Sequence, residues 1–316
     1  MKFADVRFGK LAKVLIFILV SLHVVAQQDP GLTQYMYNGQ VINPAIAGIW
    51  EKAGFTALIR EQWAGINHTP LTQSVSIHSP LKNEVIGLGL NINNETFSRE
   101  KKLSIMADYA YEIKLTPLQR LRFGVKFGFT NYKNPLSEYQ ISPDNQYDPL
   151  FSEDVDLKFV PNFGVGVFLY EENYYVGLSV PKLLENDFYN NYQNYSTQSE
   201  IRTFYLYGGY VFFIDPFSNF IFKPTLMVRA SWDMPVQYDL AANLMIYQRL
   251  WVGLMLRSGN AVSATSMWFV NKNLRVGFAM DITYNKIFPY QNGTYEFTMG
   301  YDIDFFGRGY LRAKYF

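Results

Sequence analysis

The ten residues LRFGVKFGFT, Leu121 to Thr130, alternate strictly between apolar side chains and polar or small ones. Their odd-numbered positions are Leu, Phe, Val, Phe and Phe, whereas their even-numbered positions are Arg, Gly, Lys, Gly and Thr. Such period-two alternation over about ten residues is typical of a β-strand whose two faces meet different environments. The apolar face carries no charge, as expected if it meets lipid, where Lys or Arg costs about 2–4 kcal/mol. Strands of soluble sandwiches usually have only about five or six residues, so this stretch predicts a membrane-crossing strand.

The same pattern recurs along the chain, most clearly at 220–232, 274–284 and 295–305. Segments of this kind number about fourteen, an even number as is usual for bacterial barrels. We therefore predict an all-β fold, a transmembrane antiparallel β-barrel of about 14 strands over residues 53–305. The predicted strands cover residues 53–62, 72–79, 85–93, 102–113, 121–131, 160–169, 174–180, 203–213, 220–232, 236–247, 250–258, 262–270, 274–284 and 295–305.

The connections between these segments fall into two groups. Connections after even-numbered strands are short, whereas several after odd-numbered strands are long, such as 132–159 and 181–202. Short periplasmic turns and longer outer loops are typical of outer-membrane barrels. Aromatic residues near predicted strand ends are expected to anchor the barrel at the lipid headgroups. These are Tyr109, Tyr111, Tyr170, Tyr174, Trp232, Tyr247, Trp251, Tyr284 and Tyr295.

Residues 1–26 have the organisation of a secretory signal peptide. Four basic residues precede an apolar run of about a dozen residues, 14–25, which is too short to span a bilayer. Small residues end the run, so cleavage is expected after Ala26. No other stretch reaches the ~18 apolar residues of a membrane helix, so the Asn43-Pro44-Ala45 match to water channels is chance.

The overall composition excludes several classes of function. The formal net charge is +1, which argues against a nucleic-acid partner. The chain has no Cys, so it has neither a disulfide scaffold nor a thiolate metal site. Hydrophobic residues make up 49% and aromatic residues 17% of the chain, which fits a surface that meets lipid.

Residues 27–52 contain QQDPGLTQYMYNGQVINPAIAG, Gln27 to Gly48, which follows neither a helical nor a strand period. We expect the segment to start at the periplasmic mouth and to pack as a plug, because a wide lumen fills with water unless something occupies it. A docking strap for a periplasmic partner and a flexible lead-in are the alternatives. Candidate partner-binding residues in this segment are Tyr35, Tyr37, Asn43 and Pro44.

Three stretches resemble the PorP/SprF family. They are the segment just quoted, ALIREQWAGINHTPLTQSVSIHSPL at Ala57–Leu81, and the closing FGRGYLRAKYF at Phe306–Phe316, here assigned to a C-terminal tail of residues 306–316. The resemblance implies an outer-membrane β-barrel of Bacteroidetes that serves type IX secretion, gliding motility and the tethering of secreted adhesins. It also implies partners, either periplasmic lipoprotein and ring subunits or secreted proteins with C-terminal sorting domains.

The polar faces of the predicted strands place charges of both signs in the lumen. A porin would line an open eyelet with such charges. We favour mutual pairing that fixes strand register, because the signs are mixed. The candidate lumen network is Arg60, Asp108, Arg122, Lys126, Arg229, Asp239, Arg275 and Asp281.

Catalysis has little support in the sequence. Ser74, Ser76 and His78 share one face of a predicted strand, but residues two apart on a strand are nearly 7 Å apart, beyond direct hydrogen bonding. Acidic residues from Asp144 to Asp156 lack the spacing and Gly of an EF-hand, so we read them as a solvated cluster. We predict no enzyme activity, no cofactor and no metal site.

The stretch NDFYNNYQNYSTQ, Asn186 to Gln198, is rich in Tyr and Asn and falls in a predicted outer loop. Such residues form adaptable amphipathic contact surfaces, so a secreted protein could bind here. The alternative is an aromatic loop that folds over its own barrel. Candidate contact residues are Phe188, Tyr189, Tyr192 and Tyr195.

Two functions fit these predictions. The first is a non-enzymatic scaffold or tether in the type IX secretion and gliding machinery. The second is a passive diffusion channel or a transporter of hydrophobic solutes.

Overall fold

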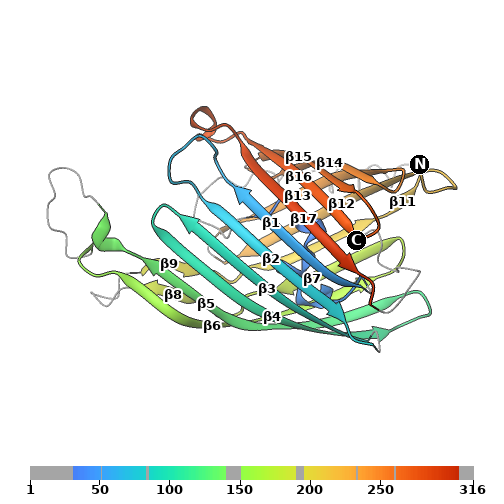
Figure 1. Ribbon diagram of the computed structural model, residues 1–316, viewed down its shortest axis with the longest axis horizontal. Coiled ribbons are helices and arrows are strands. Elements are labelled where there is room, and N and C mark those ends of the chain that lie inside the picture. Colours follow the sequence, from blue (N-terminus) through green and yellow to red (C-terminus); the bar gives the residue numbers. More distant parts are fainter. Residues whose placement is uncertain are drawn as a thin grey trace, which may run out of the picture.

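A single antiparallel sheet closes on itself to form the predicted barrel (Figure 1). The computed structural model describes residues 31–50, 52–82, 85–139, 151–189, 196–232, 234–259 and 261–305. Among these residues no helix has the length and hydropathy needed to cross a bilayer. The strands are β1 Ala53–Glu61, β2 Leu71–Pro80, β3 Ile86–Phe97, β4 Glu100–Lys114, β5 Arg120–Asn134, β6 Val155–Tyr170, β7 Tyr174–Val180, β10 Phe204–Tyr210, β11 Phe212–Phe213, β12 Phe220–Ser231, β13 Met234–Ile246, β14 Leu250–Arg257, β15 Ala261–Phe269, β16 Leu274–Thr283 and β17 Thr294–Ile303.

Two sets of pairings close the sheet. The first and last strands, β1 and β17, pair antiparallel, and β10 pairs with β7 on one side and β12 on the other. Because β10 and β11 are successive pieces of one strand, the barrel has 14 strands. Closure removes sheet edges and satisfies backbone hydrogen bonds within the sheet, as a bilayer requires.

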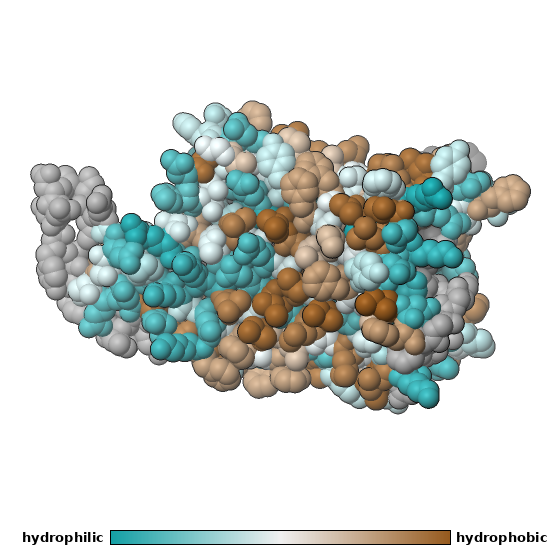
Figure 2. Space-filling view, viewed as in Figure 1, coloured by the Kyte–Doolittle hydropathy of each residue, from teal (hydrophilic) through white to brown (hydrophobic). Residues whose placement is uncertain are grey.

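The two faces of the strands are separated as the alternation predicted. In β5, Arg122 and Lys126 are buried in the lumen, whereas Phe123, Val125 and Phe127 are exposed on the outside. Figure 2 shows apolar side chains gathered over the middle of the strands and hydrophilic ones towards both ends of the barrel. The exposed apolar band is the surface that meets lipid, and the lumen holds the charges.

The connections distinguish the two ends of the barrel. One end carries six connections of three to six residues each, including 115–119 and 171–173. The other end carries the four longest, 62–70, 135–154, 181–203 and 284–293. We name them the periplasmic end and the outer end, because short turns face the periplasm. Strand β1 begins, and β17 finishes, at the periplasmic end.

The outer end holds more strand than expected. Strands β5 and β6 pair as far as Asn134 and Val155, within the predicted loop 132–159, and project beyond the other strands (Figure 1). The predicted loop 181–202 contains a two-stranded ribbon, β8 Asn186–Tyr189 and β9 Ser196–Glu200. The ring of Phe188 on this ribbon stacks on Tyr132 of β5 with centroids 4.4 Å apart. The ribbon thus packs against the projecting part of β5.

The prediction of a lipid anchor is wrong for two residues, Trp251 and Tyr170, because their side chains face the lumen. Trp251 is 2% exposed and shares its face of β14 with Arg257. Tyr170 is 3% exposed and donates a hydrogen bond of 2.9 Å to Glu112. In both cases the apolar ring lines a part of the lumen that is filled by protein.

Candidate functional site

Residues 31–50, here called the plug, lie inside the barrel as three single turns of 3-10 helix. The turns are η1 Tyr35–Tyr37, η2 Gly39–Val41 and η3 Pro44–Ile46. The Asn43 side chain accepts a hydrogen bond of 2.9 Å from the Ala45 amide, and Pro44 takes the first helical position, which has no need of an N–H. Most of the plug is buried, so it is a packed element of the lumen.

The first plug residues are held by charged side chains in the outer half of the lumen. The Glu296 carboxylate accepts hydrogen bonds from the amides of Thr33, at 2.6 Å, and Gln34, at 2.9 Å. The Thr33 hydroxyl donates to Asp281 at 2.8 Å. Arg257 donates to the carbonyl oxygen of Gly31 at 3.0 Å. These contacts satisfy the backbone of a segment that forms no sheet.

The middle of the plug contacts a second set of polar side chains. Gln40 donates to Asp108 at 2.8 Å, and Lys126 donates to the Gln40 carbonyl oxygen at 3.2 Å. Two strands along the wall, on β7, the Ser179 hydroxyl donates to the Ile42 carbonyl oxygen at 2.7 Å. The middle of the plug is therefore bound to strands β4, β5 and β7, on one side of the lumen.

The last plug residues lie at the periplasmic end. Arg122 donates to the carbonyl oxygens of Ala45, at 2.8 Å, and Ala47. The ring of Trp50 packs between His78, at 5.2 Å between centroids, and the Arg275 guanidinium, 4.4 Å from the ring centroid. The plug thus runs from the outer half of the lumen to the periplasmic rim, where β1 begins. The sequence had suggested the opposite start, at the periplasmic mouth.

Glycines in the barrel wall give the plug backbone room to approach. A Cβ atom on Gly124 would lie 2.1 Å from the Ala45 nitrogen, and one on Gly87 would lie 1.9 Å from the Ala47 oxygen. Neither distance is possible without moving backbone. In the sequence these glycines occupied lumen-facing positions, and their role could not be read without knowing what they face.

Aromatic residues of β6, β7 and β10 pack against the plug. Tyr35 and Tyr37 are 3% and 6% exposed and belong to one apolar cluster with Phe168, Tyr175 and Tyr207 of the wall. The rings of Phe168 and Tyr175 stack with centroids 5.7 Å apart. This cluster explains why some lumen-facing positions are aromatic.

The eight residues of the predicted lumen network all lie on lumen faces and take part in ion pairs. Three pairs form within the set, Arg60 with Asp281 at 2.9 Å, Lys126 with Asp108 at 2.8 Å, and Arg229 with Asp239 at 3.2 Å. The other two residues pair outside it, Arg122 with Glu112 at 3.1 Å and Arg275 with Asp302.

Sequence reasoning missed what these charges bind. Several of them hold the plug backbone, as Arg122 and Lys126 do, in addition to one another. It also omitted Arg257, which bonds both Asp239, at 3.1 Å, and the plug. The available signal was the lumen-facing parity of Arg257 in the segment LWVGLMLR.

The predicted partner-binding residues lie in two different places, the lumen and the outer ribbon. Tyr35, Tyr37, Asn43 and Pro44 are buried within the lumen, so an outside partner reaches them only if the plug moves. Phe188 is 0% exposed and serves the ribbon's own packing. The backbone of Tyr189 belongs to β8, and Tyr192 and Tyr195 lie outside the described residues.

Two of the three residues considered for catalysis, Ser76 and His78, have structural contacts. The Ser76 hydroxyl donates to Asn91 at 2.9 Å, and His78 packs against Trp50. Across the part of the chain that the structure describes, no group of three or more His, Asp or Glu side chains could hold a metal ion. Asp144 and Asp148 of the acidic loop lie outside that part.

Comparisons with known proteins identify the family. The family described as type IX secretion system membrane protein PorP/SprF matches residues 24–301. Among solved structures, the outer membrane protein Omp33 of Acinetobacter baumannii is similar at 10% identity over 80% of this chain and 100% of that chain, with a TM-score of 0.49. A TodX deltaS2S3 mutant monoaromatic hydrocarbon channel is similar at 8% identity over 85% and 94%, with the same TM-score of 0.49. No curated protein matches the chain. Since the family match covers most of the sequence, the chain belongs to the PorP/SprF family of type IX secretion system membrane proteins.

Proposed function

We propose that this protein is a non-enzymatic scaffold of the type IX secretion and gliding machinery, set in the outer membrane. It holds secreted surface proteins, adhesins among them, and connects them to periplasmic subunits. The observation that carries this proposal is the plug, whose backbone is bound from the outer half of the lumen to the periplasmic rim. A lumen filled in this way supports a structural role over a transport role.

The filled lumen argues against the alternative of a passive channel. A diffusion pore needs an open path lined by side chains that solutes can pass. The two cavities described beside the plug hold about 90 and 30 Å³. Lumen charges such as Arg60 and Arg122 are paired or bound to the plug. Solutes would have to displace the plug to cross.

The family membership supports the identity of the partners. Periplasmic lipoprotein or ring subunits would bind the turns of the periplasmic end, and secreted proteins with C-terminal sorting domains would bind the outer loops. The ribbon of β8 and β9 offers the outer contact, since it is held in a fixed position on β5 and β6.

Affinity purification of the full chain from native outer membranes in a mild detergent tests the scaffold. We expect type IX secretion subunits or secreted proteins with sorting domains to co-purify, and an unrelated outer-membrane barrel from the same membranes to retain none. A matched variant that lacks residues 187–197 should lose the secreted partner and keep the periplasmic ones. Purification of the barrel alone, together with a steady large conductance, would favour the channel.

A further inference from the structure

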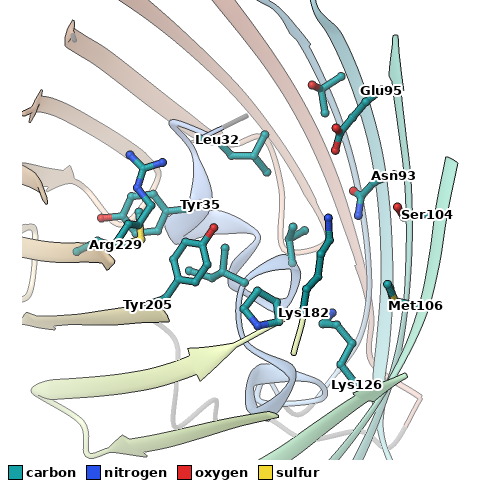
Figure 3. A pocket seen from close by; sticks show the side chains of 16 residues that line it. Leu32, Tyr35, Asn93, Glu95, Ser104, Met106, Lys126, Lys182, Tyr205 and Arg229 are labelled. Atoms are coloured by element: carbon teal, nitrogen blue, oxygen red, sulfur yellow. The ribbon is translucent and has the colours of Figure 1, made fainter. Parts of the chain in front are cut away.

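Three lysines lie on the outer surface of the barrel wall, near the outer ends of β4, β5 and β6. They are Lys101, Lys133 and Lys158, and all three are exposed. Figure 3 shows Ser104 and Met106 of β4 facing the cavity of about 90 Å³ inside the barrel. Lys101 is an odd number of residues from both, so its side chain points away from the lumen. Lys133 is the direct cross-strand partner of Lys101 and shares its outer face.

A β-bulge brings the third lysine to the same face. The register of β5 and β6 shifts beside Asn131, so that Lys158 and Phe159 of β6 both stand opposite this one residue. A bulge of this kind re-aims a side chain that would otherwise follow the alternation. Phe159 is 67% exposed, and its ring stacks on Phe129 of the lipid face with centroids 4.8 Å apart. The bulge thus sets an ammonium group directly beside apolar rings. We call the three lysines the outer lysine cluster.

The outer lysine cluster lies at the height of the outer headgroups. On the same strand, Tyr111 is 45% exposed and belongs to the aromatic residues expected at the periplasmic headgroups. Lys101 is ten positions before Tyr111, which is about 34 Å along a strand. A strand tilt of about 40° reduces this to about 26 Å across the membrane, close to the apolar band of about 25 Å in outer-membrane barrels. Lys101 and its partner Lys133 therefore lie where acyl chains give way to headgroups.

The outer lysine cluster differs from its basic neighbours in having no carboxylate partner. Arg99, in the turn between β3 and β4, forms an ion pair with Glu138. Lys102, on the lumen side of β4, forms one with Glu95 at 3.9 Å. Within the part of the chain that the structure describes, the three lysines of the cluster form no ion pair.

The acidic residues nearest to the cluster do not neutralise it. Asp156 is the cross-strand partner of Lys133, but the two form no ion pair. The Asp154 carboxylate accepts hydrogen bonds from the amide and the hydroxyl of Ser137, at 3.0 and 2.8 Å. Like charges placed directly opposite each other, as Lys101 and Lys133 are, destabilise a strand pair. An anion bound between them would remove that cost.

We propose that the outer lysine cluster binds the phosphate group of a phosphorylated lipid of the outer leaflet. Phosphate oxygens accept strong charge-assisted hydrogen bonds from ammonium groups. The lysine stems can lie along apolar surface while their heads reach the headgroup level. The rings of Phe129 and Phe159 lie beside the cluster and contact the acyl chains of the same lipid, which favours a lipid over free phosphate. The site is separate from the scaffold function, and it adds a lipid contact behind Tyr132, the residue on which the ribbon packs.

Native mass spectrometry of the purified full chain in a mild detergent tests the site, with monophosphoryl lipid A as the probe. We expect the wild type to bind the lipid and the triple variant K101Q/K133Q/K158Q to bind it at least tenfold more weakly, because one lysine near an anionic lipid surface contributes about a fivefold gain. The control K82Q/K114Q/K272Q removes three exposed lysines at the periplasmic end and should bind as the wild type does. Heat-dependent migration in gel electrophoresis checks that each variant is folded.

A variant with tighter binding makes the test independent of folding defects. D156N removes the one acid paired with the cluster's strand face, so it should bind the lipid more tightly than the wild type. A misfolded barrel would not give that result. If the triple variant does not fold, D156N and the single variants K101Q and K133Q carry the test.

Several results would overturn the proposal. Equal affinity in the wild type and the triple variant would remove the lysines from lipid binding. Equal binding of fully dephosphorylated lipid A would leave the acyl chains as the recognised part. Displacement of the lipid by an equal concentration of inorganic phosphate would indicate a site for free phosphate. Unchanged lipid binding together with lost capture of a secreted protein in the triple variant would make this surface a protein-docking face.

Discussion

At the scale of single residues, the lumen charges act on backbone as much as on one another. Glu296 accepts two plug amides and pairs with Arg60, all within a site where its side chain is 1% exposed. Burial of a charged carboxylate costs free energy unless neighbouring groups donate hydrogen bonds to it or pair with its charge. Those neighbouring groups in turn lose their partner if the carboxylate is removed. The sequence placed Glu296 on a polar face but could not show that the face meets a folded segment rather than water.

Replacement of Glu296 by Ala should therefore be costly. The change leaves the amides of Thr33 and Gln34 and the Arg60 charge without a shared acceptor, so the free energy of unfolding should fall by about 3–5 kcal/mol. Urea titration of the protein in lipid vesicles measures this. The control E172A, in the exposed turn 171–173, should stay within about 0.5 kcal/mol. Equal losses in both variants would contradict the role of Glu296.

At the scale of strands and ribbons, alternation decides most of the fold. The segment Leu121–Thr130 was sufficient to predict β5, its two faces and its membrane environment. Alternation did not predict the correct face for Trp251 and Tyr170. Both are apolar residues on the lumen face, where they pack against protein and not against lipid. The β8–β9 ribbon was missed because its stabilising contacts come from β5 and β6, far away in sequence.

A charge on the lipid face of β5 should destabilise the barrel. Val125 is 48% exposed between two other lipid-facing residues near the middle of the strand. The variant V125K should lose about 2–4 kcal/mol of unfolding free energy in vesicles. The matched variant L118K changes a 68% exposed residue of the short turn 115–119 and should have little effect. If V125K were as stable as L118K, the outer face of β5 would not meet lipid.

The ribbon should loosen in acid through Glu200, which lies at the end of β9. Burial disfavours its charge, but Lys182, 3.3 Å away, Lys102 and the Asn186 and Asn162 amides outweigh burial, so the pKa of Glu200 stands below its usual value of 4.5. Because the folded pKa is lowered, this stabilisation is present above about pH 4.5 and is lost as the pH falls through the folded pKa.

Hydrogen exchange of the β8 and β9 amides, corrected for intrinsic rates, measures this loss between pH 6 and pH 3. Exchange should quicken in the wild type as the pH falls, while E200Q should exchange faster than the wild type at pH 6 and change less with acid. The control E153Q, at an exposed position, should follow the wild type. If E200Q had the same pH profile as the wild type, Glu200 would not be the group whose protonation loosens the ribbon.

At the scale of the whole molecule, the barrel is a wall built around a segment of its own chain. The wall could be read from the sequence, and a plug was the favoured interpretation of residues 27–52, with a docking strap and a flexible lead-in as alternatives. The path of the plug could not be read, because it depends on contacts such as Ser179 with Ile42 that join residues 137 positions apart. The local sequence pattern of QVINPAIAG does not predict those contacts.

Displacement of the plug should turn the closed barrel into a conducting one. In G124A the added Cβ meets plug backbone, which has to move. We expect the wild type to give no steady large conductance in a planar bilayer and G124A to give one. The control A264V enlarges an exposed residue on the lipid face of β15 and should behave as the wild type. A silent G124A that binds lipid and folds normally would contradict the plug's role as the barrier.

The hydrogen bonds that hold Thr33 and Gln34 also bear on how the barrel closes. Arg60 and Glu296 face each other across the junction of β1 and β17, so Thr33 of the plug contacts both sides of the seam where the first and last strands meet. We therefore expect closure of that seam and packing of the plug to be coupled. A barrel whose plug has not yet entered the lumen would lack these hydrogen bonds across the seam, and β1 and β17 would be held together by their own pairing alone.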